Sequence, residues 1–294
     1  MGSLLDAHCS EPTRTPPVIS AEPSQAGSVC WARTALGDVA VQNDDRAKLD
    51  AWLTAAEHRY FAGLRVQEIT RALRALSSAY VERRERGTRQ RVQGALDTAG
   101  KRAAFALYYA PLHFIAVTEA VGALHAAQPG PASIVDVGCG TGAAGAAWAI
   151  AAGSTPAVIG IDRHPWAVAE TRWTLSQLGL NGHAKQGQAD RLRTLRAGES
   201  VIAAYTLNEL PDAARERVEQ QMCTVASKGG RLLVLEPLAR GVAPWWSATA
   251  KRIIALGGRA DEWKLTVDVP PVVRLLGTAA GLNYRELRFQ TLFL

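Results

Sequence analysis

The spacing of apolar side chains changes along the chain and divides it into three segments. Residues 1–43 show no sustained period and are rich in Pro, Ser, Gly and Ala, so we expect a flexible tail. Between residues 44 and 127 apolar positions recur every three or four residues, which predicts a helical region whose stripes pack together. The stripe consists of Leu49, Trp52, Leu53, Ala56, Val66, Ile69, Leu73, Leu76 and Tyr80. Residues 128–294 alternate short apolar runs with helical stretches, which predicts an α/β fold.

Within residues 128–294, strand and helix patterns alternate after a linker rich in Pro and Gly, Gln128–Ala132. This alternation predicts a parallel sheet with helices on both faces. Strands are expected at 134–137, 157–161, 182–186, 201–205 and 231–236. A last helix is expected over 268–281 and a strand or hairpin over 282–294. Only one closing strand is clear from this pattern, so the presence of a second is left open.

A further helical stretch, Ala103–Ala127, precedes the first strand and is expected to break near Pro111. It carries Tyr108, Tyr109, His113 and Phe114 and could lie over a cofactor site. A histidine among apolar residues is usually a packing residue, so His113 is not counted among the catalytic candidates.

A glycine-rich turn follows the first strand. Gly138, Gly140 and Gly142 occupy alternate positions between an apolar run and an Ala-rich stretch, 143–152, that predicts a helix. A strand, a glycine loop and a helix N-terminus together form a cofactor cradle. The spacing also satisfies the dinucleotide pattern, but the carboxylate of Asp136 would repel a pyrophosphate and attract the sulfonium and ammonium of S-adenosylmethionine (SAM). Asp162 ends the second strand, where a carboxylate can accept the hydroxyls of a ribose.

The run from Asp136 to Gly142, Asp-Val-Gly-Cys-Gly-Thr-Gly, resembles the first motif of class I SAM-dependent methyltransferases. Asp162 resembles the acidic end of their second strand. The resemblance implies a Rossmann-like sheet, SAM as the cofactor and methyl transfer as the reaction. It also places adenine contacts at 188–190. The residues of this segment are Gln188, Ala189 and Asp190. The family usually has Gly-Asp-Ala here, whereas this chain has Gly187-Gln188-Ala189, so that Gln188 stands in the acidic position unless Asp190 takes its place.

The loop after the fourth strand contains Asn208 and Glu209, and in this fold it lies beside the transferred methyl group. It lacks the Asn-Pro-Pro-Tyr sequence that grips a planar amino group, which disfavours exocyclic N-methylation of a base by that arrangement. Asn208 and Glu209 are the catalytic or substrate-positioning candidates, and Asn208 is also a cofactor candidate. Alternatively, Asn208 caps the following helix.

Charge and cysteine content add a few constraints. The 294 residues carry a net charge of +6, which suits an RNA partner as well as an ordinary solvated surface. A basic stretch includes Arg83, Arg84, Arg86, Arg89, Arg91, Lys101 and Arg102. The scattered Cys9, Cys30, Cys139 and Cys223 suggest neither a metal site nor disulfides, so we expect reduced thiols and a cytoplasmic location. No signal peptide or membrane span is expected; the apolar stretch 142–161 is better explained as helix, turn and strand.

The order of several segments resembles, over residues 45–294, the methyltransferase-like family associated with the small ribosomal subunit of bacteria and mitochondria. They are Ala79–Arg84, Lys101–Tyr108, Tyr205–Pro211 and Leu233–Pro237. The resemblance implies ribosomal RNA or the small subunit as partner, although the cysteine cluster that many members carry is missing here. Three functions therefore stay open: methylation of ribosomal RNA or a ribosomal protein, methylation of a small molecule under a helical lid, and SAM-dependent assembly without catalysis.

Overall fold

The structure is a computed structural model that describes residues 43–86, 96–238, 243–282 and 286–294. The predicted tail, apart from its last residue, lies outside the described residues, as do Cys9 and Cys30. The side chains of Tyr80 and of the arginines from Arg83 to Arg91 are also outside the described part.

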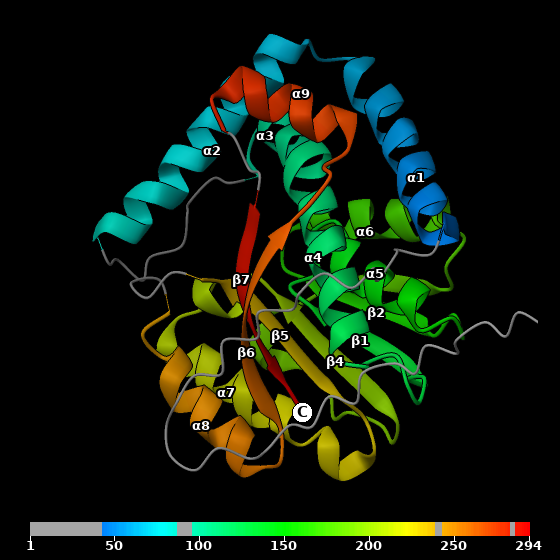
Figure 1. Cartoon of the computed structure of the whole chain (residues 1–294), viewed down its shortest axis with the longest axis vertical. Coiled ribbons are helices and arrows are strands. Elements are labelled where there is room, and N and C mark those ends of the chain that lie inside the picture. Colours follow the sequence, from blue (N-terminus) through cyan, green and yellow to red (C-terminus); the bar gives the residue numbers. More distant parts are fainter. Residues whose placement is uncertain (1–42, 87–95, 239–242, 283–285) are drawn as a thin grey trace, which may run out of the picture.

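A single seven-stranded sheet runs through the molecule in the order β3-β2-β1-β4-β5-β7-β6 (Figure 1). Its strands are β1 (Ser133–Val137), β2 (Ala157–Asp162), β3 (Gly182–Gln186), β4 (Glu199–Ala204), β5 (Leu232–Pro237), β6 (Arg259–Thr266) and β7 (Glu286–Phe293). The first five strands are parallel, and β7 pairs antiparallel with both β5 and β6. The β-branched runs of β1 and β4 are buried because the sheet is covered on both faces.

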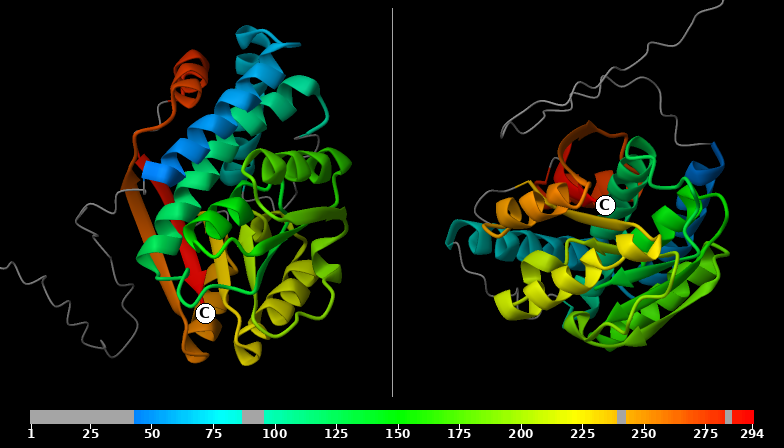
Figure 2. Two further views of the ribbon diagram at one scale, coloured as in Figure 1. Left: turned by 90° about the vertical axis from the view of Figure 1, so that its right-hand side faces the viewer. Right: turned by 90° about the horizontal axis from the view of Figure 1, so that it is seen from below.

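The helices form layers on the two faces of the sheet (Figure 2). They are α1 (Asn43–Phe61), α2 (Val66–Arg86), α3 (Ala99–Ala104), the π-helical turn η1 (Phe105–Tyr109), α4 (Ala110–Ala123), α5 (Ala143–Ala151), α6 (Pro165–Gln177), α7 (Asp212–Cys223), α8 (Trp246–Ala255) and α9 (Pro271–Ala280). On one face, α4, α5 and α6 pack against residues such as Ile134 and Ile202. On the other, α7 and α8 pack against Val135 and Val201. This confirms the Rossmann-like sheet expected from the sequence.

The predicted stripe of the helical region is the core of an additional helical layer. Leu49, Trp52, Leu53 and Ala56 of α1 are buried, as are Ile69, Leu73 and Leu76 of α2. Helices α2, α3 and η1 share a hydrophobic cluster with Val272, Val273 and Leu276 of α9. The helical region therefore packs against an element from the far end of the chain as well as against the sheet.

The C-terminal part contains both closing strands, which resolves the point that the pattern left open. The last strand covers 286–293, and β6 lies at the edge of the sheet, after α8. Within β6, Asp261 and Trp263 are buried, whereas Arg259, Lys264 and Thr266 are exposed. Charged side chains are a common protection for an edge strand, and here Arg259, Asp261, Glu262 and Lys264 hide the strand in the sequence. The helix expected over 268–281 begins later, at Pro271, because two prolines, Pro270 and Pro271, suit a helix entry.

The expected break near Pro111 is wrong. Pro111 lies in the first turn of α4, where its missing N–H is tolerated, and α3, η1 and α4 follow one another without a gap. Within the described residues this run, Ala99–Ala123, is the one helix long and apolar enough to cross a membrane by length and composition. Of its most apolar window, 67% is buried inside the structure, as in a core helix.

Candidate active site

The glycine loop after β1 depends on three residues with left-handed backbones. Gly138, Gly140 and Gly142 have φ angles of 69°, 55° and 79°. Glycine adopts this region without the steric cost that a side chain brings. The backbone N–H groups of Gly138 and Cys139 both donate to the Ile161 carbonyl of β2, at 2.8 and 3.2 Å. The loop is thereby fixed against the neighbouring strand before α5 begins.

Two of these glycines also permit close approaches to other elements. A Cβ built on Gly138 would lie 2.4 Å from Thr206 Cγ2, and one on Gly142 would lie 2.8 Å from Thr171 Cγ2. Gly138 therefore lets the loop after β4 reach the glycine loop, where the Thr206 hydroxyl donates to the Gly138 carbonyl at 3.3 Å. At Gly140 the closest neighbour of an added Cβ is Phe105, at 3.5 Å.

Asp136 points from β1 into the first turn of α5. Its side chain is 1% exposed, and Oδ2 accepts a hydrogen bond from the Gly145 N–H at 2.9 Å. Burial raises the pKa of Asp136 to about 7, and the nearby Asp162 adds to this rise, while the Gly145 N–H opposes it. The carboxylate therefore stabilises the strand-to-helix turn through a backbone donor that α5 itself leaves unpaired.

Asp162 lies at the carboxyl end of β2 and bridges two loops. Its Oδ2 accepts from the Gly140 N–H at 3.0 Å, and its Oδ1 accepts from the His164 N–H at 2.8 Å. Burial raises the pKa of Asp162, and these two backbone donors oppose the rise. The second strand and the glycine loop thus meet at one carboxylate.

The segment after β3 holds the three residues predicted to contact adenine, and their side chains differ in how open they are to a ligand. Asp190 Oδ2 pairs with Arg217 Nη2 of α7 at 2.6 Å, and this hydrogen bond lowers the pKa of Asp190. Gln188 is exposed and Ala189 is half-buried. Asp190 is thus held by α7, whereas the Gln188 amide is open to solvent.

Asn208 and Glu209 belong to a short 3-10 turn, Leu207–Glu209, after β4. The Asn208 N–H donates at 3.1 Å to Oε1 of Glu236, a fully buried carboxyl group in β5. Pro211 precedes α7 and no side chain caps that helix, so the alternative role of Asn208 as helix cap is wrong. Glu236 holds the candidate loop at the carboxyl edge of the sheet.

Four rings from distant segments lie together beside the glycine loop. We call Phe105, Tyr109, His113 and Tyr205 the ring cluster. Tyr205 follows β4 and stacks on His113, with ring centroids 4.1 Å apart and an angle of 19°. Phe105 meets His113 edge-on at 6.0 Å and Tyr109 at 5.8 Å. The spacing of four between Phe105, Tyr109 and His113 was the available signal, but nothing local connects them to Tyr205.

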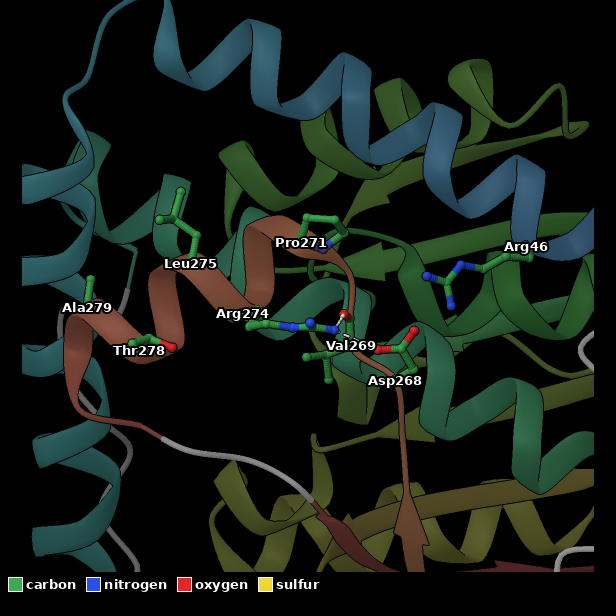
Figure 3. A pocket seen from close by; sticks show the side chains of 8 residues that line it. All are labelled: Arg46, Asp268, Val269, Pro271, Arg274, Leu275, Thr278 and Ala279. Atoms are coloured by element: carbon green, nitrogen blue, oxygen red, sulfur yellow. Dashed lines mark hydrogen bonds and ion pairs between the residues drawn. The ribbon is translucent and has the colours of Figure 1, made fainter.

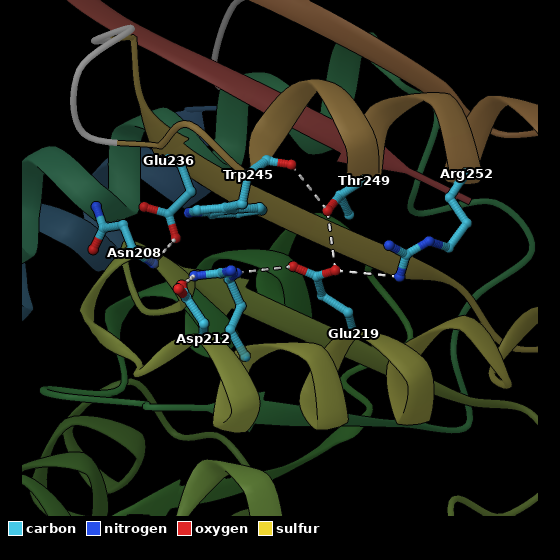
Figure 4. Close-up of polar contacts among 8 residues, drawn as sticks. Asn208, Asp212, Glu219, Glu236, Trp245, Thr249 and Arg252 are labelled. Carbon is cyan, nitrogen blue, oxygen red and sulfur yellow. Dashed lines mark hydrogen bonds and ion pairs between the residues drawn. The ribbon is translucent and has the colours of Figure 1, made fainter. Parts of the chain in front are cut away.

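A cluster of polar side chains joins α7 to α8 close to the loop of Asn208 (Figure 4). Arg215 pairs with Asp212 at 2.7 Å and with Glu219 at 3.3 Å, and its guanidinium lies 5.2 Å from the ring centre of Trp245. Glu219 also accepts from Thr249 at 3.0 Å. Each carboxylate here has a cationic or hydroxyl partner, so the cluster is a packing element between the two helices.

Two other features are separate from this edge. A hollow of about 600 Å³ lies along α9, lined by residues that include Arg46, Arg274 and Leu275 (Figure 3). None of the predicted site residues lines it. Across the described ranges, no group of three or more His, Cys, Asp or Glu side chains is placed to hold a metal ion.

Comparison with known proteins identifies the glycine-loop segment. Residues 134–230 match the family model described as "Methyltransferase domain". A search of curated proteins found no match. This match covers β1 to the end of the helix after β4, which is the part that builds the edge described above.

Solved structures with a similar arrangement include proteins with different acceptors. One is the tRNA (uracil-54, C5)-methyltransferase of Pyrococcus abyssi, at 15% identity and a TM-score of 0.39, over 64% of this chain and 38% of that one. Another is the magnesium protoporphyrin IX methyltransferase of Synechocystis, at 14% identity and a TM-score of 0.41, over 62% and 78%. A third is precorrin 8w decarboxylase of Methanobacterium thermoautotrophicum, at 21% and 0.41, over 61% and 89%. These likenesses select no substrate. The family match is confined to residues 134–230 and indicates a methyltransferase domain there.

Proposed function

We propose that SAM binds at the carboxyl edge of β1, β2 and β4, and that the observation carrying this assignment is the bridge from Asp162 to the Gly140 N–H. The fit is good at the glycine loop, where left-handed glycines leave the backbone bare of side chains. Gly138, Gly140 and Gly142 cradle the cofactor, Asp136 supports the loop through the Gly145 N–H, and Asp162 accepts the ribose hydroxyls. Gln188, Ala189 and Asp190 lie on the adenine side, and Asn208 lies on the methyl side.

When bound, SAM supplies an activated methyl group together with its own leaving group. The chain therefore needs mainly to bind, orient and exclude water. Asn208 and Glu209 are our candidates for positioning the acceptor, and the Glu209 carboxylate is our candidate for the base that takes its proton. Glu236 keeps this loop in place through the Asn208 N–H.

For the acceptor we propose RNA of the small ribosomal subunit. This proposal is supported by the resemblance of the segments quoted above, by the net charge of +6, and by exposed cations at the carboxyl edge. Arg163 directly follows β2, and Lys185 and Arg191 lie near the end of β3; all three are exposed. Such cations suit the phosphates of an RNA.

For this function we assign a role to each of three segments of the chain. We propose a tail over 1–43, a helical region over 44–127 that faces the acceptor, and a SAM-binding domain over 128–294. A cytoplasmic location accompanies a ribosomal acceptor.

The test uses purified protein with methyl-labelled SAM in an extract from cells that lack the protein. We expect label in small-subunit RNA, and less label with Asp162→Ala at a limiting SAM concentration, because this variant binds the cofactor more weakly. Label in a ribosomal protein or only in small molecules would overturn the RNA assignment. Binding of SAM and of the subunit without any transferred label would instead identify an assembly factor.

RNA contact is tested separately by its salt dependence. Replacement of both Lys185 and Arg191 by Ala is expected to reduce the slope of log affinity against log salt by about 0.7 for each lost phosphate contact. The matched control replaces Lys251 and Lys264, which lie on α8 and β6. An equal slope in both double variants would show that the edge cations Lys185 and Arg191 do not contact the RNA.

A further inference from the structure

The helical run beside the glycine loop contains a π-helical turn that its neighbours lack. In η1 the N–H of Ala110 donates to the carbonyl of Phe105, five residues earlier. Ala106, Leu107 and Tyr108 of this turn are buried, whereas Phe105 and Tyr109 are partly exposed. Such turns occur frequently at functional sites because they change which side chains share a helix face.

The helix face that this π-turn creates carries three rings of the ring cluster and lies beside the glycine loop. Phe105 lies against Gly140, where it would be 3.5 Å from an added Cβ. His113, two turns further along, meets both Phe105 and Tyr205. The cluster therefore spans from the proposed cofactor cradle to the loop of Asn208 and Glu209.

Tyr205 reaches this cluster by an unusual backbone conformation. Its φ angle is 57°, in the left-handed region that a residue with a large side chain seldom adopts. The Tyr205 N–H still pairs with the Leu235 carbonyl at 2.8 Å, so the turn belongs to the sheet edge itself. Strain of this kind is concentrated at ligand-binding positions.

The cluster is electrically neutral at physiological pH. Burial lowers the pKa of His113 to about 3, so its imidazole is uncharged. Burial and the nearby Glu236 raise the pKa of Tyr205, so its hydroxyl stays protonated. All four residues are partly exposed. A cluster of neutral, partly exposed aromatic residues favours a flat apolar partner over a strongly hydrated one.

We propose that the ring cluster is the acceptor-recognition surface of this methyltransferase, and that the acceptor group is a planar, uncharged heteroaromatic ring such as a nucleobase. The acceptor ring extends the stack of His113 and Tyr205, with its reactive edge toward the loop of Asn208 and Glu209. This inference rests on the proposed binding of SAM at the glycine loop. It gives the helical region a direct part in the site, because three of the four rings come from η1 and α4.

The test measures stacking with the cofactor site already filled. The full-length protein is saturated with S-adenosylhomocysteine, and its affinity for this compound is measured by calorimetry. Two fluorescent probes are then titrated: free 2-aminopurine riboside, and a single-stranded RNA hexamer that contains one 2-aminopurine. Stacking on the rings is expected to quench the probe. Quenching by the hexamer alone indicates an RNA acceptor, and quenching by the riboside as well indicates that the ring suffices.

Variants assign the quenching to the rings. Tyr205→Leu and His113→Leu are expected to weaken probe binding by ten- to a hundredfold, while the affinity for S-adenosylhomocysteine changes less than threefold. Tyr205→Phe, which keeps the ring, is expected to restore probe binding. The matched control is Phe61→Leu, a partly buried phenylalanine at the end of α1 outside the cluster.

Failure of this inference is distinguishable from failure of the proposed function. No binding of S-adenosylhomocysteine by the folded wild-type protein would overturn the cofactor site and, with it, this proposal. Normal binding of that compound without quenching of either probe would overturn the ring cluster alone. Loss of S-adenosylhomocysteine affinity in Tyr205→Leu and His113→Leu would assign the rings to the cofactor, which also contradicts the proposal.

Discussion

The carboxylate of Asp162 accepts a hydrogen bond from the backbone N–H of Gly140, with 3.0 Å between Oδ2 and N. These residues are 22 positions apart, and the contact joins the end of β2 to the glycine loop that follows β1. Because Oδ1 is held by the His164 N–H at the same time, the orientation of the carboxylate is fixed before any ligand arrives. A ribose that binds here meets an acceptor whose rotational freedom has already been removed.

Replacement of Asp162 by Ala is therefore expected to weaken SAM binding by about 1–3 kcal/mol, because both the ribose contact and the loop tether are lost. Calorimetric titration with SAM measures this change. Asp268→Ala is the matched control, since Asp268 is exposed and lies before α9. Equal affinities of the wild type and Asp162→Ala would mean that the ribose lies elsewhere.

Gly138→Ala is expected to destabilise the fold both through its backbone conformation and through a steric clash, and the control Gly229→Ala separates these two effects. The φ angle of 69° disfavours any side chain, and the new methyl group would lie 2.4 Å from Thr206 Cγ2. Gly229 has a φ of 70° with no atom within 4 Å of an added Cβ, so Gly229→Ala carries only the conformational cost of about 1 kcal/mol. The free energy of unfolding should fall by a further ~1–3 kcal/mol in Gly138→Ala.

A double-mutant cycle with Thr206→Ala tests the origin of that excess. Removal of Thr206 Cγ2 and Oγ1 relieves the nearest contacts of the added methyl group. Most of the excess over Gly229→Ala should then disappear in the double variant. Strictly additive losses would show that Thr206 is not what makes glycine necessary at this position.

The sequence predicts local features of the site well because their signals are local. The apolar run of β1, the alternate glycines and Asp162 all lie where their patterns indicate, and β3 covers the predicted 182–186. The stripe positions from Leu49 to Ala56 in α1 and from Ile69 to Leu76 in α2 are buried as their period requires. In each case a few consecutive residues carry the information, through backbone preference or hydrophobic period.

The features that the sequence did not reveal depend on contacts between distant segments. The stack of His113 on Tyr205 joins α4 to the end of β4, and neither neighbourhood contains a sign of the other. The edge strand β6 is masked by its charged positions, such as Arg259 and Lys264. The π-turn of η1 has no sequence pattern that distinguishes it from α-helix. Tertiary packing, not propensity, decides these features.

Asp136 gives the stability of the protein a pH dependence with a definite sign. Its pKa is about 7 in the folded state, against an ordinary value of 3.8. The folded state therefore holds a proton that the unfolded state has released, and stability falls as the pH rises from about 4 to about 7. One pKa unit corresponds to 1.36 kcal/mol, so this carboxyl group contributes a fall of about 3–5 kcal/mol over that window.

Asp136→Asn should remove this contribution. The amide oxygen still accepts from the Gly145 N–H, but no charge appears in the core as the pH rises. Denaturant unfolding between pH 4.5 and pH 8 should give a smaller pH dependence for Asp136→Asn than for the wild type, with the variant relatively more stable above pH 7. Asp268→Asn, an exposed replacement, should follow the wild type. Parallel curves for wild type and Asp136→Asn would show that the Asp136 carboxyl group is already ionised at low pH.

The ion pair of Arg59 and Glu170 connects α1 to α6, at 2.9 Å between Nη1 and Oε2. The Glu170 side chain is 1% exposed, and the Arg59 guanidinium also lies 4.6 Å from the ring centre of Trp173. Burial raises the pKa of Glu170, and the Arg59 charge opposes this rise. Because α6 begins three residues after Asp162, at Pro165, the pair links the helical region to the strand end that we assign to the ribose.

Arg59→Ala leaves a buried carboxylate without its cation, which costs several kcal/mol for a fully buried pair. Since 41% of the Arg59 side chain is exposed, water reduces that penalty, and we expect a loss of about 1–3 kcal/mol in the free energy of unfolding. Glu170→Gln removes the charge that needs a partner, so the combined variant should lose less than the sum of the two single variants. Denaturant unfolding of all four proteins measures this coupling, and hydrogen exchange of α1 locates it. Additive losses, or unchanged protection of α1 in Arg59→Ala, would show that apolar packing of Leu49, Trp52 and Leu53 alone holds the helical region on the sheet.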